Sequence, residues 1–143
     1  MRTNIYLDVD GVLLANEKYA AEYAPEFIEY VINRYPDSTY WLTTRCRGDV
    51  SEVLSQLKPL FDEKTYKLLE KIKPTNWEEA KTEAIDFTKP FLWFDDDLFD
   101  DEKEDLIKHN ALDNYINVDL YKKSDQLADF INSFPIPVVI CDA

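Results

Sequence analysis

The sequence predicts an α/β domain with a mainly parallel sheet and helices on both faces. Short apolar runs that suit buried strands alternate with segments in which apolar residues recur at helical spacing. Three of these runs end in polar residues, at Asp8, at Thr43 and at Asp95, so polar chemistry is expected at one edge of the sheet. The chain has the size of one domain and no linker-like segment. We therefore expect a single domain over residues 1–143.

Each element is predicted from local composition. Strands are expected where apolar, β-branched and aromatic residues run together, and helices where apolar residues recur every three or four positions. In chain order these are a strand at 5–7, a helix at about 22–34, a strand at 39–42, a helix from Asp49 to about Leu60, a helix around 68–72, a helix through Ala80 and Ile85, a strand at 90–94, a helix at 104–110, a strand at 115–118 and a helix at 124–134. Residues 135–143 are expected to form an extra edge strand or a tail.

Turn and capping residues set the limits of several elements. Pro36 and Asp37 break the first helix before the second strand begins. Asp49 can cap the helix that follows this strand. The segment 74–76 offers both a turn and a cap for the helix expected after it. The chain contains only two glycines, so the glycine at position 11 is a candidate for a position that needs its backbone freedom.

The charge excludes some classes of partner. The net charge is −13, from 29 acidic and 16 basic residues, so an extended nucleic-acid surface and binding to anionic membranes are not expected. No apolar run approaches the roughly 20 residues of a membrane span. The N-terminal segment turns acidic at once, unlike a signal peptide. Because Cys46 and Cys141 form no disulfide framework, a cytoplasmic location is expected.

Carboxylates gather at the expected strand ends. Asp8 and Asp10 are separated by one residue, so their side chains leave a strand on the same side, and Gly11 allows the chain to turn away. Asp95 and Asp96 end another strand of the same layer. Carboxylates so close together repel each other, and a hard cation with oxygen ligands would relieve the repulsion. The sequence therefore predicts a Mg²⁺ site.

The same residue types suit phosphoryl transfer. A carboxylate can attack phosphorus and form an acyl phosphate, and a second acid can protonate the leaving group and then activate water. A hydroxyl and an ammonium could hold the phosphoryl oxygens, and Thr43 and Lys81 are the candidates.

The order of these motifs resembles that of the haloacid dehalogenase (HAD) superfamily. The four matching segments are Asp8-Val9-Asp10-Gly11-Val12, Trp41-Leu42-Thr43, Lys81 and Trp93-Phe94-Asp95-Asp96. The resemblance covers about residues 1–121. It implies a Rossmann-like three-layer sandwich and a Mg²⁺-dependent phosphohydrolase.

The resemblance also implies roles for individual residues. Asp8 matches the nucleophile and Asp10 the general acid/base. Thr43 matches the threonine that holds the phosphoryl group, with Thr44 as the alternative. Lys81 matches the family's lysine, with Lys73 as the alternative farther upstream.

The remaining matches concern the metal and the entrance to the site. Asp95 and Asp96 match the acidic pair that, with Asp8 and Asp10, would hold Mg²⁺. The segments 11–42 and 44–80, which separate the motifs, are too short for a full cap domain. The site is therefore expected to be open to a large phosphorylated substrate. Arg45 and Arg47 are candidates for its rim.

Alternative functions stay open at this stage. The chain also resembles HAD domains of RNA-repair proteins and small deoxyribonucleotidases, so a nucleotide-like substrate is one alternative. A second is a regulatory module that holds Mg²⁺ and a phosphate without turnover. The acids at 95–97 could also be a solvated loop that leads into a capped helix. The oligomeric state is not predicted.

Overall fold

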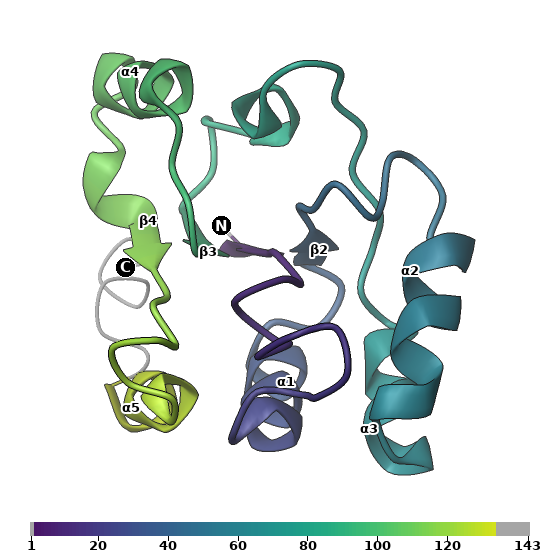
Figure 1. Cartoon of the computed structure of the whole chain (residues 1–143). Helices are drawn as coiled ribbons and strands as arrows, with labels where there is room; N and C mark the ends of the chain where they lie inside the picture. Colours follow the sequence, from purple (N-terminus) through teal and green to yellow (C-terminus); the bar gives the residue numbers. More distant parts are fainter. Residues whose placement is uncertain (1, 134–143) are drawn as a thin grey trace.

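The computed structural model describes residues 2–133, and within them four parallel strands form one sheet. The strand order is β2-β1-β3-β4, with every neighbouring pair parallel (Figure 1). The strands are β1 (Asn4–Leu7), β2 (Thr39–Trp41), β3 (Phe91–Asp95) and β4 (Tyr115–Asn117). The predicted α/β class with a mainly parallel sheet is confirmed.

Helices cover both faces of the sheet. The α-helices are α1 (Ala24–Arg34), α2 (Ser51–Leu57), α3 (Glu63–Leu69), α4 (Asp100–Lys108) and α5 (Gln126–Ser133). Three short 3₁₀ helices are η1 (Lys58–Leu60), η2 (Lys81–Ala84) and η3 (Leu112–Asn114). Figure 1 shows α1 and α5 on one face of the sheet and α4 on the other. The result is a Rossmann-like three-layer sandwich, and the described residues contain no separate cap domain.

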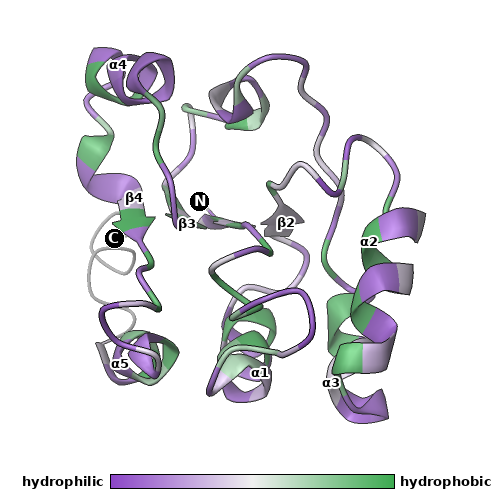
Figure 2. Cartoon of the chain, in the orientation of Figure 1, coloured by the Kyte–Doolittle hydropathy of each residue, from purple (hydrophilic) through white to green (hydrophobic). Residues whose placement is uncertain are grey.

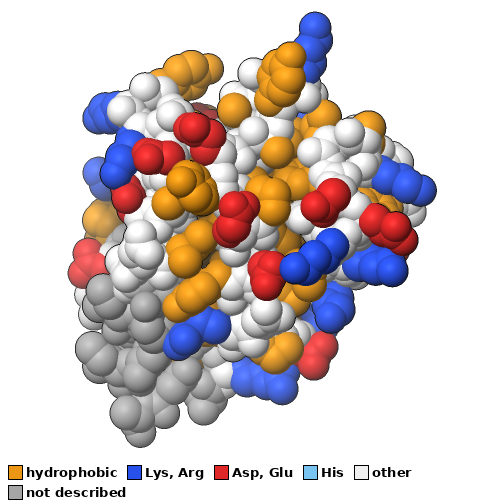
Figure 3. Space-filling model, turned by 90° about the horizontal axis from the view of Figure 1, so that it is seen from below, with side chains coloured by type: hydrophobic (Ala, Val, Ile, Leu, Met, Phe, Trp, Pro, Cys, Tyr) orange, Lys and Arg blue, Asp and Glu red, His pale blue; other side chains and the backbone are white. Residues whose placement is uncertain are grey.

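The alternation of side chains along the strands builds a core on each face. Ile5 and Leu7 of β1 belong to the larger core, which includes the buried side of α1, whereas Tyr6 between them belongs to a second core that includes Leu106 of α4. Figure 2 shows that the helices carry both hydrophilic and hydrophobic residues, as expected where one side covers a sheet and the other meets water. Figure 3 views the face that carries α1 and α5, where charged side chains of both signs lie among hydrophobic ones.

The helix expected through Ala80 and Ile85 is wrong, because only η2 forms there. The Glu83 carboxylate accepts hydrogen bonds from the backbone N–H groups of Glu78, Glu79 and Ala80 at 2.7–3.2 Å. These bonds hold the backbone in a turn and compete with helical pairing. The loop that leads to Lys81 is therefore fixed by a side chain.

Other elements differ from the expectations mainly in length. The helix expected from Asp49 to Leu60 is α2 followed by η1, which contains Pro59. The helix expected at 104–110 begins at Asp100, where acidic residues in the first turn favour a start. Residues 135–143, expected as an edge strand or a tail, lie outside the described part of the chain.

A further segment pairs with the outer side of β2. The backbone N–H of Trp41 donates to the Lys73 carbonyl at 2.8 Å, and that of Lys73 donates to the Thr39 carbonyl at 3.0 Å. The Lys73 ammonium lies 6.0 Å from the centre of the Tyr40 ring. None of the helices within residues 2–133 combines the length and the apolar composition that a membrane span needs.

Phe27 provides a test of the core between α1 and the sheet. Its ring is fully buried and meets Phe94 of β3 edge to face at 5.3 Å. Phe27→Ala should lower the free energy of unfolding by about 3–5 kcal/mol, because it leaves a cavity. Urea unfolding measures this, with Asn33→Ala at an exposed position of the same helix as the control. Equal midpoints for the two variants would contradict this packing.

Candidate active site

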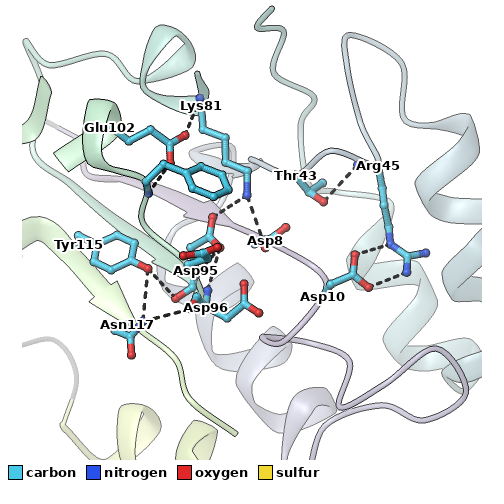
Figure 4. Close-up of polar contacts among 12 residues, drawn as sticks. Asp8, Asp10, Thr43, Arg45, Lys81, Asp95, Asp96, Glu102, Tyr115 and Asn117 are labelled. Carbon is cyan, nitrogen blue, oxygen red and sulfur yellow. Dashed lines mark hydrogen bonds and ion pairs between the residues drawn. The ribbon is translucent and has the colours of Figure 1, made fainter. Parts of the chain in front are cut away.

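Three carboxylates meet at the carboxyl ends of β1 and β3. Asp8 directly follows β1, Asp95 is the last residue of β3, and Asp96 comes next. One oxygen from each lies within 4.8 Å of the others, close enough to hold one metal ion (Figure 4). Asp8 and Asp95 are 6% and 1% exposed, whereas Asp96 is open to solvent. One side of the cluster is therefore accessible to a ligand.

Lys81 supplies the positive charge beside these acids. Its Nζ lies 2.6 Å from Oδ2 of Asp95 and 3.5 Å from Oδ2 of Asp8, and the side chain is buried. Its backbone N–H donates to Oε2 of Glu102 at 3.0 Å. Glu102 is itself buried at the start of α4, and its other oxygen accepts from the N–H of Phe99. The start of α4 thus fixes the position of Lys81.

One ammonium does not balance three carboxylates. Burial, together with the charge of Asp8, raises the pKa of Asp95 to about 8 against the opposing effect of Lys81. Partial burial and the charge of Asp8 also raise the pKa of Asp96. For Lys81, burial alone would lower the pKa, but the charges of Asp8 and Asp95 outweigh it and raise the pKa. The excess negative charge makes this a place where a divalent cation would be stabilised.

Backbone and β4 contacts hold the acidic turn after β3. Oδ1 of Asp95 accepts from the N–H groups of Asp96 at 2.8 Å and of Asp97 at 3.2 Å. The Tyr115 hydroxyl donates to the Asp95 carbonyl at 3.1 Å, and the Asn117 amide donates to the Asp96 carbonyl at 3.4 Å. The Asp95 carboxylate and the backbone of the turn are therefore held in place before any ligand arrives.

Gly11 allows the two acidic segments to approach each other. Its φ is +78°, a left-handed conformation that disfavours other residues. A Cβ at this position would overlap the carboxylate of Asp96. The glycine of the first motif is therefore required both by the turn and by Asp96.

Asp10 lies apart from the three carboxylates. Its two oxygens accept from Nε of Arg45 at 2.9 Å and from Nη2 at 2.6 Å, while Nη1 of Arg45 donates to Gln56 of α2 at 2.8 Å. The hydrogen bonds from Arg45 lower the pKa of Asp10. The sequence predicts that the Asp10 side chain is one of the metal ligands. The structure instead places it against Arg45, half-exposed at the edge of the site.

Thr43 is buried, and its hydroxyl accepts the N–H of Arg45 at 3.3 Å. Figure 4 places it on the side of Asp8 that faces Arg45. A hydroxyl that accepts a hydrogen bond still has a proton to donate. Thr44, the alternative, is exposed. Between the two lysine candidates, Lys81 lies in the site and Lys73 lies beyond β2.

Arg47 has a different position from the expected rim ligand. Its guanidinium stacks on the Trp77 ring at 3.8 Å, and Nη1 donates to the Glu78 carbonyl at 2.9 Å. It therefore ties the segment after β2 to the loop that leads to Lys81. Sequence reasoning missed Gln56 and Glu102. Glu102 resembles an ordinary acid at a helix start, and nothing in its local sequence signals that it is buried.

Comparison of the chain with protein-family models, with curated proteins and with solved structures found no match. The basis for a function is therefore the contact of Lys81 with Asp8 and Asp95, the position of Asp96 beside them, and the pairing of Asp10 with Arg45.

The two glycines offer a matched test of the cluster. Gly11→Ala and Gly48→Ala both place alanine at positive φ, +78° and +87°, so each should cost about 1–2 kcal/mol of stability. Only Gly11→Ala pushes against Asp96, since a Cβ at Gly48 meets Asn76 at an ordinary 3.7 Å. We expect Gly11→Ala alone to weaken Mg²⁺ binding, measured by titration calorimetry. Equal weakening in both variants would contradict a site at Asp96.

Proposed function

We propose that this chain is a Mg²⁺-dependent phosphomonoester hydrolase of the HAD type, with Asp8 as the nucleophile. The observation that carries the proposal is the contact of the Lys81 ammonium with Asp8 and Asp95. Lys81 is the first residue of η2, 73 positions from Asp8 (81 − 8) and 14 positions from Asp95, and its place in the chain agrees with the order of the HAD motifs. A solvated acidic loop would not need a buried lysine at its centre.

Asp8, Asp95 and Asp96 would hold Mg²⁺. The ion would supply positive charge to the phosphoryl oxygens and reduce the repulsion between phosphate and carboxylates. Lys81 would add its charge from the buried side, and Thr43 would donate a hydrogen bond. These groups match the need of phosphoryl transfer for positioning and charge stabilisation.

The reaction has two displacements. An oxygen of Asp8 attacks phosphorus, the bond from phosphorus to the alcohol oxygen breaks, and Asp10 gives that oxygen a proton. Water then loses a proton to Asp10 and attacks phosphorus. The bond between phosphorus and Asp8 breaks, which releases phosphate and restores the Asp8 carboxylate.

Asp10 has to leave Arg45 to take part. The guanidinium keeps Asp10 as a carboxylate, since it lowers the pKa, and a carboxylate cannot donate a proton. Asp10 is half-exposed, which leaves room for its side chain to turn toward the leaving group. A substrate phosphate would compete for the same guanidinium and favour this movement.

Asp8→Asn tests the nucleophile. Phosphate release from a small aryl phosphate with Mg²⁺ should fall below about one-thousandth of the wild-type rate, because the amide is a poor nucleophile. EDTA should have a similar effect on the wild type. Asp113→Asn removes an equal charge at an exposed position and should leave the rate unchanged.

Two outcomes would decide against the proposal. Full activity of Asp8→Asn would show that Asp8 is not the nucleophile. If the folded wild-type protein binds Mg²⁺ but releases no phosphate from any substrate, a module that binds without turnover becomes the better description.

Asp10 and Asp96 should separate catalysis from metal binding. Asp10→Asn should slow phosphate release by about 10²–10⁴-fold, since it removes the proton donor, but keep the Mg²⁺ affinity. Asp96→Asn should weaken Mg²⁺ binding because it removes an oxygen of the cluster. Calorimetry and steady-state rates on both variants provide the comparison. A loss of Mg²⁺ affinity in Asp10→Asn would indicate that Asp10 is a metal ligand after all.

A further inference from the structure

A groove of about 660 Å³ opens beside the acidic cluster. One wall is the loop between β1 and α1, and the other is the segment after β4. Asp10, Gly11 and Asp96 lie among its lining residues, so the groove is continuous with the site. Its volume is in the range of sites that bind small molecules.

The groove carries an unbalanced negative charge. Its lining contains no lysine or arginine but five acids, namely Asp10, Glu17, Glu22, Asp96 and Asp119. Asp10 is paired with Arg45 and Asp96 belongs to the acidic cluster, so the excess charge comes from the other three. Within residues 2–133, Glu17, Glu22 and Asp119 make no ion pair. They are therefore available to a charged ligand.

Tyr121 adds an aromatic ring to the second wall of the groove. Its side chain is fully exposed, although its backbone N–H is held by the Asp119 carboxylate at 3.2 Å. An exposed ring beside carboxylates is suited to a cation, which is attracted both to the face of the ring and to the acids.

We propose that this groove binds the alcohol part of the substrate, and that the substrate is a small phosphate monoester whose alcohol carries an ammonium group. The inference rests on the proposed phosphatase function, since the phosphate would lie at Asp8 and Lys81 while the ammonium lies between Glu17, Glu22, Asp119 and Tyr121. The same carboxylates would repel a second phosphate group. A nucleoside polyphosphate or an oligonucleotide would therefore fit this groove poorly.

Matched phosphonates test the inference without turnover, because their carbon–phosphorus bond resists hydrolysis. Aminoalkylphosphonates with chains of two to four carbons are compared with alkylphosphonates of equal length, which lack only the ammonium. Affinities for the wild-type protein in Mg²⁺ are measured by calorimetry. We expect at least one aminoalkyl ligand to bind about five- to tenfold more tightly than its neutral partner, as expected from one or two exposed charge pairs.

Paired variants locate the effect in the groove. The double variant Glu17→Gln, Glu22→Gln should reduce the preference for the amino ligand to about twofold or less. The double variant Glu26→Gln, Glu70→Gln removes the same charge at exposed positions outside the groove and should keep the preference. Tyr121→Ala should weaken only the amino ligands.

The inference is overturned if wild type binds both members of every pair equally, if neither member binds, or if both double variants change the preference alike. It fails separately from the proposed function. If the protein hydrolyses phosphate esters of uncharged alcohols and shows no preference for an ammonium group, this inference is wrong and the phosphatase proposal stands. If the protein binds the amino ligands more tightly but releases phosphate from no substrate, the phosphatase proposal is wrong and the groove still binds an ammonium group.

Discussion

The site depends on one interaction, the contact of the buried Lys81 ammonium with the carboxylates of Asp8 and Asp95. Buried charges are costly unless they are paired, so this lysine makes it feasible to bring two acids together inside the protein. Contacts with the surrounding chain fix the position of Lys81. The Glu83 carboxylate fixes the loop before Lys81, the Glu102 carboxylate of α4 accepts its backbone N–H, and Lys81 itself begins the short helix η2.

Asp8 and Asp10 show how position gives the same residue type two different properties. They are separated by one residue, yet Asp8 faces a buried ammonium and two other carboxylates, while Asp10 lies half-exposed against a guanidinium. β1 ends at Leu7, and the backbone N–H groups of Val12 and Leu13 donate to the Val9 carbonyl, so Asp10 lies in a turn and not on the strand. Different environments for a pair of carboxylates are what a nucleophile and a proton carrier require.

The sequence predicts much of the fold because strands have local signatures. Apolar runs locate all four described strands to within a residue or two, and their polar ends locate Asp8, Thr43 and Asp95 on one edge of the sheet. The missed features depend on contacts between distant residues. Arg45 meets Asp10 across 35 positions, and Glu102 meets Lys81 across 21. Composition at either position gives no sign of its partner.

The pairing of Lys73 with β2 has a consequence for how folded molecules meet one another. An open strand edge can recruit a strand from another copy and start an intermolecular sheet. On the β2 side, backbone groups of Thr39 and Trp41 are already engaged by Lys73, whose charged side chain lies nearby over Tyr40. The segment at Lys73, which extends the sheet on this side, thus also disfavours edge-to-edge aggregation through β2.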